Sequence, residues 1–84
     1  NKMQRYSCVI IEDEPLAMEK VALFIQQHPE LHCVATFYNL EEGWRYLVEH
    51  SIHIVFLDLN VGGHFSFDRL EQEYITSKII ITSA

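Results

Sequence analysis

Four short apolar runs, separated by stretches with helical periodicity, constrain this chain more than any other feature. The runs are rich in Val, Ile, Phe and Thr, and they comprise residues 6–11, 31–37, 53–59 and 78–82. Most are apolar on successive residues instead of alternating, which is typical of strands buried on both faces of a parallel sheet. The second run is the least regular, because His32 and Thr36 interrupt it.

Helical patterns fill the intervals between these runs. The first helix is predicted to begin at Pro15 and to end before Pro29, Asn39 is expected to cap a second, and Ser66 begins a weaker third. Gly43 is costly inside the second helix. The apolar stripes expected to pack on the sheet are Ala17, Val21, Phe24 and Ile25 in the first helix, Leu40, Trp44, Leu47 and Val48 in the second, and Phe67, Leu70 and Tyr74 in the third.

The element order is therefore β-α-β-α-β-α-β. Right-handed crossovers then give an α/β fold in which a parallel sheet has helices on both faces. We expect the flavodoxin-like, doubly wound strand order 2-1-3-4.

Composition and charge exclude several classes of function. The chain has 84 residues, enough for one small domain, and a formal net charge of −6. Such a chain is a poor electrostatic match for nucleic acid or an anionic membrane. Its longest apolar run, residues 21–25, has five residues, too few for a membrane span or a secretory signal. Cys8 and Cys33 lack metal-binding spacing and are interpreted as buried thiols of a cytosolic protein, with a disulfide or reactive thiol as the alternative.

Acidic residues follow two of the apolar runs. Glu12, Asp13 and Glu14 come directly after the first run, and Asp58 lies near the end of the third. Open α/β sheets bind ligands at the carboxyl ends of their strands, and the expected order makes strands one and three neighbours there. Asp13 and Asp58 should therefore meet in one crevice, whereas Glu14 is interpreted as a residue of the loop or of the helix N-terminus.

Carboxylates that converge in a half-buried crevice repel one another, so they need a cation or shifted pKa values. Glu12, Asp13 and Asp58 are hard oxygen ligands, which suit Mg²⁺. A carboxylate beside such an ion can act as a nucleophile toward a phosphoryl group. Thr82 and Ser83 close the fourth run beside the same crevice, where a hydroxyl can donate a hydrogen bond to a phosphoryl oxygen.

Three motifs carry a resemblance to a known family. They are CVIIEDEPLA at residues 8–17, IVFLDLN at residues 54–60 and IITSA at residues 80–84. In this order they resemble the receiver domain of two-component response regulators. The EDEPLA segment is similar to regulators that carry a LytTR-type DNA-binding output domain.

The resemblance implies a role for each matching residue. Asp58 would accept a phosphoryl group from the histidine of a sensor kinase. Glu12, Asp13 and Asp58 would hold Mg²⁺, together with the backbone carbonyl of Asn60. Ser83 would contact the phosphoryl group, and Thr82 would then point into the sheet, although Thr82 is the alternative for this role.

The resemblance also implies a cytoplasmic signalling protein that is not an enzyme. It would regulate transcription through a DNA-binding domain outside residues 1–84, and this segment itself would bind neither nucleic acid nor membrane. A receiver continues with a further helix, a fifth strand that carries a lysine and a last helix, so residues 1–84 are interpreted as a truncated receiver. Lys78 lies at the wrong end of its strand to replace that lysine.

Truncation would leave Ile79, Ile80 and Ile81 at a sheet edge, and such an edge invites pairing. We therefore expect a homodimer or a strand-paired or domain-swapped assembly. Two other functions stay open: a receiver-like interaction module that is never phosphorylated, and a haloacid-dehalogenase-type phosphatase fragment. That phosphatase family has a general acid-base aspartate two residues after its nucleophile, where this chain has Asn60.

Overall fold

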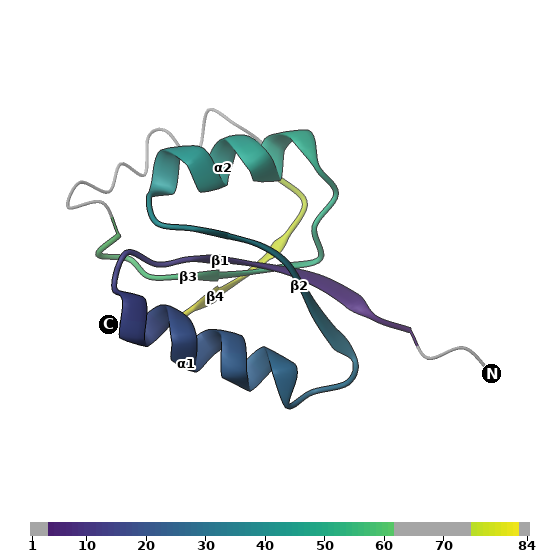
Figure 1. Cartoon of the computed structure of the whole chain (residues 1–84). Helices are drawn as coiled ribbons and strands as arrows, with labels where there is room; N and C mark the ends of the chain where they lie inside the picture. The colour runs from purple at the N-terminus through teal and green to yellow at the C-terminus, as the bar shows by residue number, and fades with distance from the viewer. Residues whose placement is uncertain (1–3, 62–74, 83–84) are drawn as a thin grey trace.

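The computed structural model describes residues 4–61 and 75–82 (Figure 1). Along the chain lie β1 (Tyr6–Ile11), α1 (Pro15–Gln26), β2 (Leu31–Phe37), α2 (Leu40–Glu49), β3 (Ile54–Leu57) and β4 (Lys78–Ile81). All strand pairs are parallel and the order is β2-β1-β3-β4, which confirms the doubly wound fold. The helix expected from Ser66, with Phe67, Leu70 and Tyr74, lies outside the described residues.

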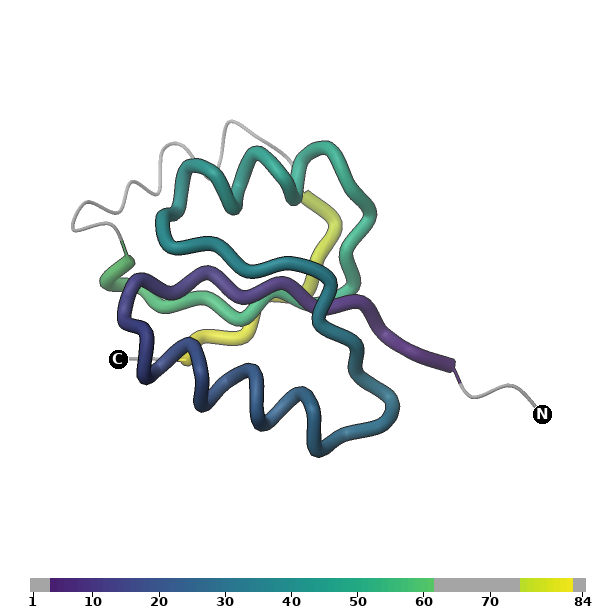
Figure 2. The backbone as a smooth tube through the Cα atoms, in the orientation of Figure 1, coloured from purple at the N-terminus to yellow at the C-terminus, as the bar shows by residue number. Residues whose placement is uncertain are grey.

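The two helices lie on opposite faces of the sheet (Figures 1 and 2). Because successive side chains of a strand point to opposite faces, β1 contributes to both cores. Beneath α2 the core contains Val9, Ile11, Leu40, Trp44, Leu47, Ile52, Val55, Leu57 and Val61. Beneath α1 it contains Cys8, Ile10, Met18, Ile25 and Phe56. The predicted burial on both faces is therefore confirmed for residues 8–11 of the first run and 55–57 of the third.

The helix boundaries agree with the sequence signals. α1 begins at Pro15, although its N-cap residue Glu14 makes no capping hydrogen bond through its side chain. At α2 the Asn39 Oδ1 accepts a hydrogen bond of 2.8 Å from the backbone N–H of Glu42, as the capping pattern predicts. Val48 was expected to face the sheet, but it is exposed.

The inward stripe of α1 differs from the expected one. Met18 and Ile25 are its buried residues, and Met18 was not among those expected. Phe24 is 47% exposed, and its ring meets that of Phe56 edge-on at a centroid distance of 6.2 Å. The reason is that α1 covers the sheet beside β1 and β2, so Phe24 faces the less covered side toward β3 and β4.

The outer strands are not buried on both faces; the prediction from successive apolar residues was wrong for β2, whereas the exposure of β4 agrees with the sheet edge expected there. Burial along β2 alternates from residue to residue, and every residue of β4 is exposed. Both are edge strands in the described part of the chain, so each has a strand neighbour on one side alone. In this chain an apolar run therefore indicates a strand, but it does not indicate that the strand is buried on both faces.

The structure also bears on the two cysteines and on the expected absence of a membrane span. Cys8 and Cys33 are free thiols that lie opposite each other in the β1–β2 register, and burial raises the pKa of both. This fits the interpretation as a buried thiol for Cys8, whereas Cys33 is half-buried. Within the described ranges, neither helix has the length and apolar character needed to cross a membrane.

Candidate functional site

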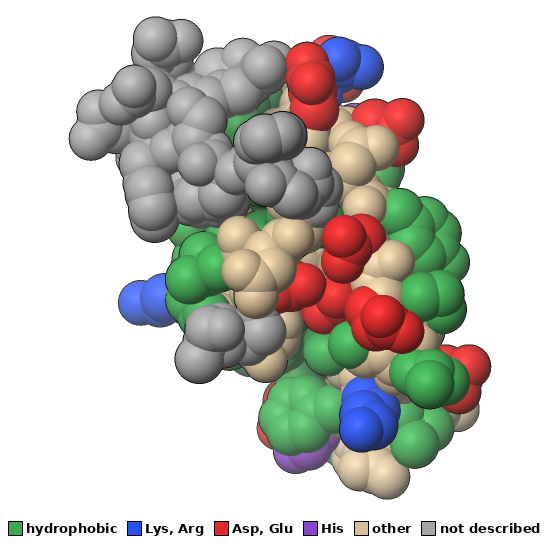
Figure 3. All heavy atoms as spheres, turned by 90° about the vertical axis from the view of Figure 1, so that its left-hand side faces the viewer, with side chains coloured by type: hydrophobic (Ala, Val, Ile, Leu, Met, Phe, Trp, Pro, Cys, Tyr) green, Lys and Arg blue, Asp and Glu red, His purple; other side chains and the backbone are tan. Residues whose placement is uncertain are grey.

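Backbone hydrogen bonds join the carboxyl end of β1 to β3 on one side and to β2 on the other, and they extend the sheet by one residue. The N–H of Asp58 donates to the Ile11 carbonyl at 3.1 Å, and the N–H of Glu12 donates to the Phe37 carbonyl at 2.9 Å. Glu12 and Asp58 are therefore held by ordered backbone instead of by a loose loop. Figure 3 faces this end of the sheet and shows acidic side chains gathered in the middle of it.

Three carboxylates form one cluster at this end. Glu12, Asp13 and Asp58 each offer an oxygen, and these atoms all lie within 4.8 Å of one another. Glu12 is 4% exposed and Asp58 is 6% exposed, whereas Asp13 is exposed. The structure thus brings together the residues that the sequence placed in one crevice, and two of the three have lost most of their contact with water.

Backbone donors orient the two buried carboxylates. The N–H of Asn60 donates to the Asp58 Oδ1 at 3.0 Å, and the N–H of Glu14 donates to the Glu12 Oε2 at 3.2 Å. Each bond spans two residues, so each acidic residue fixes the start of the turn that follows its strand. Asn60 consequently lies in the turn directly after Asp58, and Glu14 contributes through its backbone.

The cluster is electrostatically strained. Burial is the largest cause that raises the pKa of Glu12, followed by its hydrogen bond to Asp58 and by the charges of Asp58 and Asp13. The backbone N–H of Glu14 acts in the opposite direction, but the net shift is upward. A cation bound here would relieve the same repulsion that the raised pKa reflects. The donor set, three hard oxygens with one of them exposed, fits Mg²⁺.

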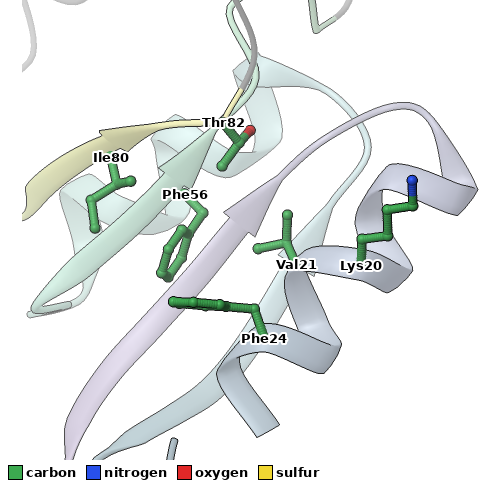
Figure 4. Close-up of a pocket in the computed structure, with 6 residues that line it drawn as sticks. All are labelled: Lys20, Val21, Phe24, Phe56, Ile80 and Thr82. Carbon is green, nitrogen blue, oxygen red and sulfur yellow. The ribbon is translucent and has the colours of Figure 1, made fainter. Parts of the chain in front are cut away.

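Thr82 lies at the end of β4, and its backbone N–H donates to the Leu57 carbonyl at 2.9 Å. Thr82 is exposed, like every residue of β4, and the expectation that it points into the sheet stays a prediction. It lines a hollow of about 200 Å³ together with Lys20, Val21, Phe24, Phe56 and Ile80. The hollow lies between α1 and β4, with the rings of Phe24 and Phe56 in its middle (Figure 4). Ser83 lies outside the described residues.

Lys20 is the residue of this region that sequence reasoning missed. It lies on α1 one turn before Phe24 and lines the same hollow as Thr82. The spacing of Lys20, Val21 and Phe24 places them on one face of the helix, and this spacing was the available signal.

No family model matches the chain, but sequence relatives and solved structures do. The sensory transduction protein LytT of Enterococcus faecalis is 30% identical over 64 residues, which are 76% of this chain and 26% of LytT. The transcriptional regulatory protein YpdB of Escherichia coli K12 is 30% identical over 53 residues, which are 63% of this chain and 22% of YpdB. The chain therefore spans about a quarter of the length of these relatives, and they confirm the resemblance to LytTR-type regulators.

Two solved structures share the fold. The response regulatory domain of mrkE from Klebsiella pneumoniae superposes with a TM-score of 0.76 at 22% identity, over 93% of this chain and 66% of that chain. A chain of the co-crystal structure of the Saccharomyces cerevisiae phosphotransfer protein Ypd1 with the receiver domain of Ssk1 gives a TM-score of 0.65 at 16% identity. That match covers 99% of this chain and 65% of that chain.

Proposed function

Because the chain is a receiver domain of the response-regulator family, we propose that it accepts a phosphoryl group on Asp58 from a histidine of a sensor kinase. The observation that carries the proposal is the convergence of Glu12, Asp13 and Asp58, whose oxygens lie within 4.8 Å of one another at the carboxyl ends of β1 and β3. The co-crystal of a receiver domain with a histidine phosphotransfer protein supports a phosphohistidine donor.

Glu12, Asp13 and Asp58 would hold Mg²⁺, with the backbone carbonyl of Asn60 as a further ligand. Their fit rests on the hard oxygen donors and on the raised pKa of Glu12, which reflects uncompensated negative charge. When bound, Mg²⁺ supplies positive charge that neutralises the oxygens of the transferred phosphoryl group.

The chain's own residues position the reacting carboxylate. The Asn60 N–H holds the Asp58 Oδ1, so the carboxylate is oriented before the donor arrives. In the transfer, an Asp58 oxygen forms a bond to phosphorus as the bond from phosphorus to the histidine nitrogen breaks, and the released imidazole takes up a proton. Ser83, or Thr82 in its place, would donate a hydrogen bond to the phosphoryl oxygen.

Receiver domains are signalling modules, and this chain would act as an acceptor instead of a turnover enzyme. Output would come from a DNA-binding domain elsewhere in a longer cytoplasmic protein that controls transcription. Residues 1–84 would bind neither nucleic acid nor membrane themselves, in keeping with their charge of −6.

Incubation with a small phosphoryl donor and Mg²⁺, followed by intact-mass spectrometry, tests the assignment. We expect one added phosphoryl group on the native chain and none on Asp58→Asn. Glu30→Gln is the matched control, because Glu30 is an exposed acidic residue in the turn at the opposite end of the sheet, and it should label like the native chain. Equal labelling of Asp58→Asn and the native chain would refute Asp58 as the acceptor.

A further inference from the structure

Cys8 and Cys33 lie next to each other on the same face of the sheet. They are directly paired in the parallel register of β1 and β2. Cys8 belongs to the core beneath α1, and Cys33 packs against that core, so both side chains face α1. Neighbouring strands are about 4.8 Å apart, and disulfides join Cα atoms that are about 4.4–6.8 Å apart. The backbone therefore places two free thiols within reach of a disulfide.

A bulge in β2 begins directly after Cys33. The register changes from Cys8–Cys33 to Val9–Ala35, so Val34 is an extra residue of β2 that the register skips. Ala35 packs against the core beneath α2, although Cys33 and Ala35 would share a face in a regular strand. The bulge thus separates the two residues onto opposite faces. Because it already interrupts the ladder, β2 can adjust beside Cys33 without breaking further pairs.

We propose that Cys8 and Cys33 form a reversible disulfide that locks β2 onto β1 when the chain meets a peroxide. β2 has a strand neighbour on one side alone in the described part of the chain, so its hold on the sheet depends on β1. The covalent link closes residues 8–33, which include all of α1, into one loop. Such a loop restricts the unfolded chain and so stabilises the folded one. The inference does not depend on phosphorylation of Asp58.

In the reduced chain the two sulfurs lean away from each other. The Cys8 Sγ donates to the Tyr6 carbonyl at 3.5 Å, toward the amino end of β1. The Cys33 Sγ donates to the Ala35 carbonyl at 3.6 Å, toward the carboxyl end of β2. Thiols are weak donors, so a rotation about each Cα–Cβ bond gives up little. Burial also raises the pKa of both thiols, which keeps the thiolate fraction small, and the pair therefore stays reduced until an oxidant acts on it.

Cys33 is the sulfur that a peroxide reaches, because it is half-buried whereas Cys8 is fully buried. The Cys33 thiolate attacks one oxygen of hydrogen peroxide, the O–O bond breaks, and the leaving oxygen takes up a proton and departs as water. The Cys8 sulfur then gives up its proton and attacks the sulfur of the Cys33 sulfenic acid, whose S–O bond breaks to release a second water. The two electrons that the sulfurs lose reduce the peroxide. A dithiol reductant reverses the reaction by thiol–disulfide exchange.

Mass spectrometry of the native chain after exposure to hydrogen peroxide in buffer tests the proposal. We expect a linked pair of peptides that contain Cys8 and Cys33, lighter by two hydrogen atoms, and full recovery of both thiols with dithiothreitol. The chain contains no other cysteine. The oxidised chain should unfold at a urea midpoint higher by about 1 M or more, because the disulfide closes a loop. Oxidised cysteines without the link, links between chains, or an unchanged midpoint would each overturn the proposal.

Moving one thiol to the opposite face separates proximity from unfolding. Cys33→Ala combined with Ala35→Cys keeps two thiols in the same two strands, but the new thiol lies on the α2 face. Cys8→Ala combined with Val9→Cys does the same from β1, because Val9 lies beneath α2. Circular dichroism identifies which variant folds like the native chain. That variant should form the disulfide in buffer about tenfold more slowly or less, because its thiols are not aligned. A rate equal to that of the native chain would show that the link forms through unfolding and would overturn the proposal.

Discussion

Gly43 offers a sharp test of how α2 is held against the sheet. A Cβ at this position would lie 2.5 Å from the Ile11 Cδ1 and 2.7 Å from its Cγ1. Carbon atoms in favourable contact are about 3.5–4.0 Å apart, so Ile11 or the helix would have to move by about 1 Å. Ile11 is fully buried among the side chains beneath α2, which leaves it little room.

Two effects of Gly43→Ala oppose each other. Replacing glycine by alanine inside a helix stabilises by about 1 kcal/mol. Overpacking a buried site costs about 1–3 kcal/mol. We expect the steric cost to exceed the helix gain, with a net loss of about 1 kcal/mol in the free energy of unfolding. Gly43→Val adds two more methyl groups to the same contact and should lose about 3 kcal/mol.

Urea unfolding monitored by circular dichroism measures this difference. With a slope of about 1–1.5 kcal/mol per molar urea, Gly43→Ala should lower the midpoint by somewhat less than 1 M at unchanged slope. Ile11→Val removes Cδ1 and should cost about 0.5–1.5 kcal/mol in the native chain, but less in the Gly43→Ala background. Val48→Ala, exposed on the same helix, is the control and should stay within about 0.5 kcal/mol of the native chain. A Gly43→Ala variant as stable as the native chain would refute the close-approach argument.

Three further predictions concern the cap, the carboxylate cluster and the thiols. Asn39→Ala removes the acceptor of the Glu42 N–H and should cost about 1 kcal/mol in urea unfolding; no loss would show that the cap is dispensable. The pKa of Glu12 in the folded chain is raised above its ordinary value of 4.5. At pH values between 4.5 and this raised pKa, the folded metal-free chain therefore binds more protons than the unfolded chain. Its free energy of unfolding should therefore rise as the pH falls from neutral toward 4.5, and Glu12→Gln should flatten this slope; an opposite slope would contradict the sign. Burial raises the pKa of Cys8 and Cys33, so alkylation near neutral pH should be much slower in buffer than in urea, and equal rates would exclude their protection.

The order of elements and the strand order were predictable from the sequence. Apolar runs and helical stripes identify elements independently of what surrounds them, and the right-handed crossover rule then fixes their arrangement. The carboxylate cluster followed from the same logic, because Glu12 and Asp58 each come directly after a strand. The adjacency of β1 and β3 was sufficient to predict that these carboxylates lie close together.

Burial within an element was the part that the sequence could not supply. Val48 belongs to the apolar stripe of α2 and was expected to face the sheet, yet it is exposed, whereas Ile79, Ile80 and Ile81 are exposed at a sheet edge as expected. Gly43 is unfavourable in a helix when α2 is considered alone. Its lack of a side chain leaves room for Ile11 of β1, which is distant in sequence. A local pattern carries no information about which partner reaches a residue from another element.

The same backbone that positions the cluster also prevents its charges from separating. Glu12 and Asp58 are tied into the sheet through their own N–H groups, and each carboxylate is held by the turn that follows. Neither side chain can move into water without breaking such bonds, so the repulsion must be relieved where it arises. A proton on Glu12 or a cation between the carboxylates can each do this, and the two compete for the same oxygens. The negative charge held at the carboxyl end of the sheet would therefore favour a bound cation, such as the proposed Mg²⁺.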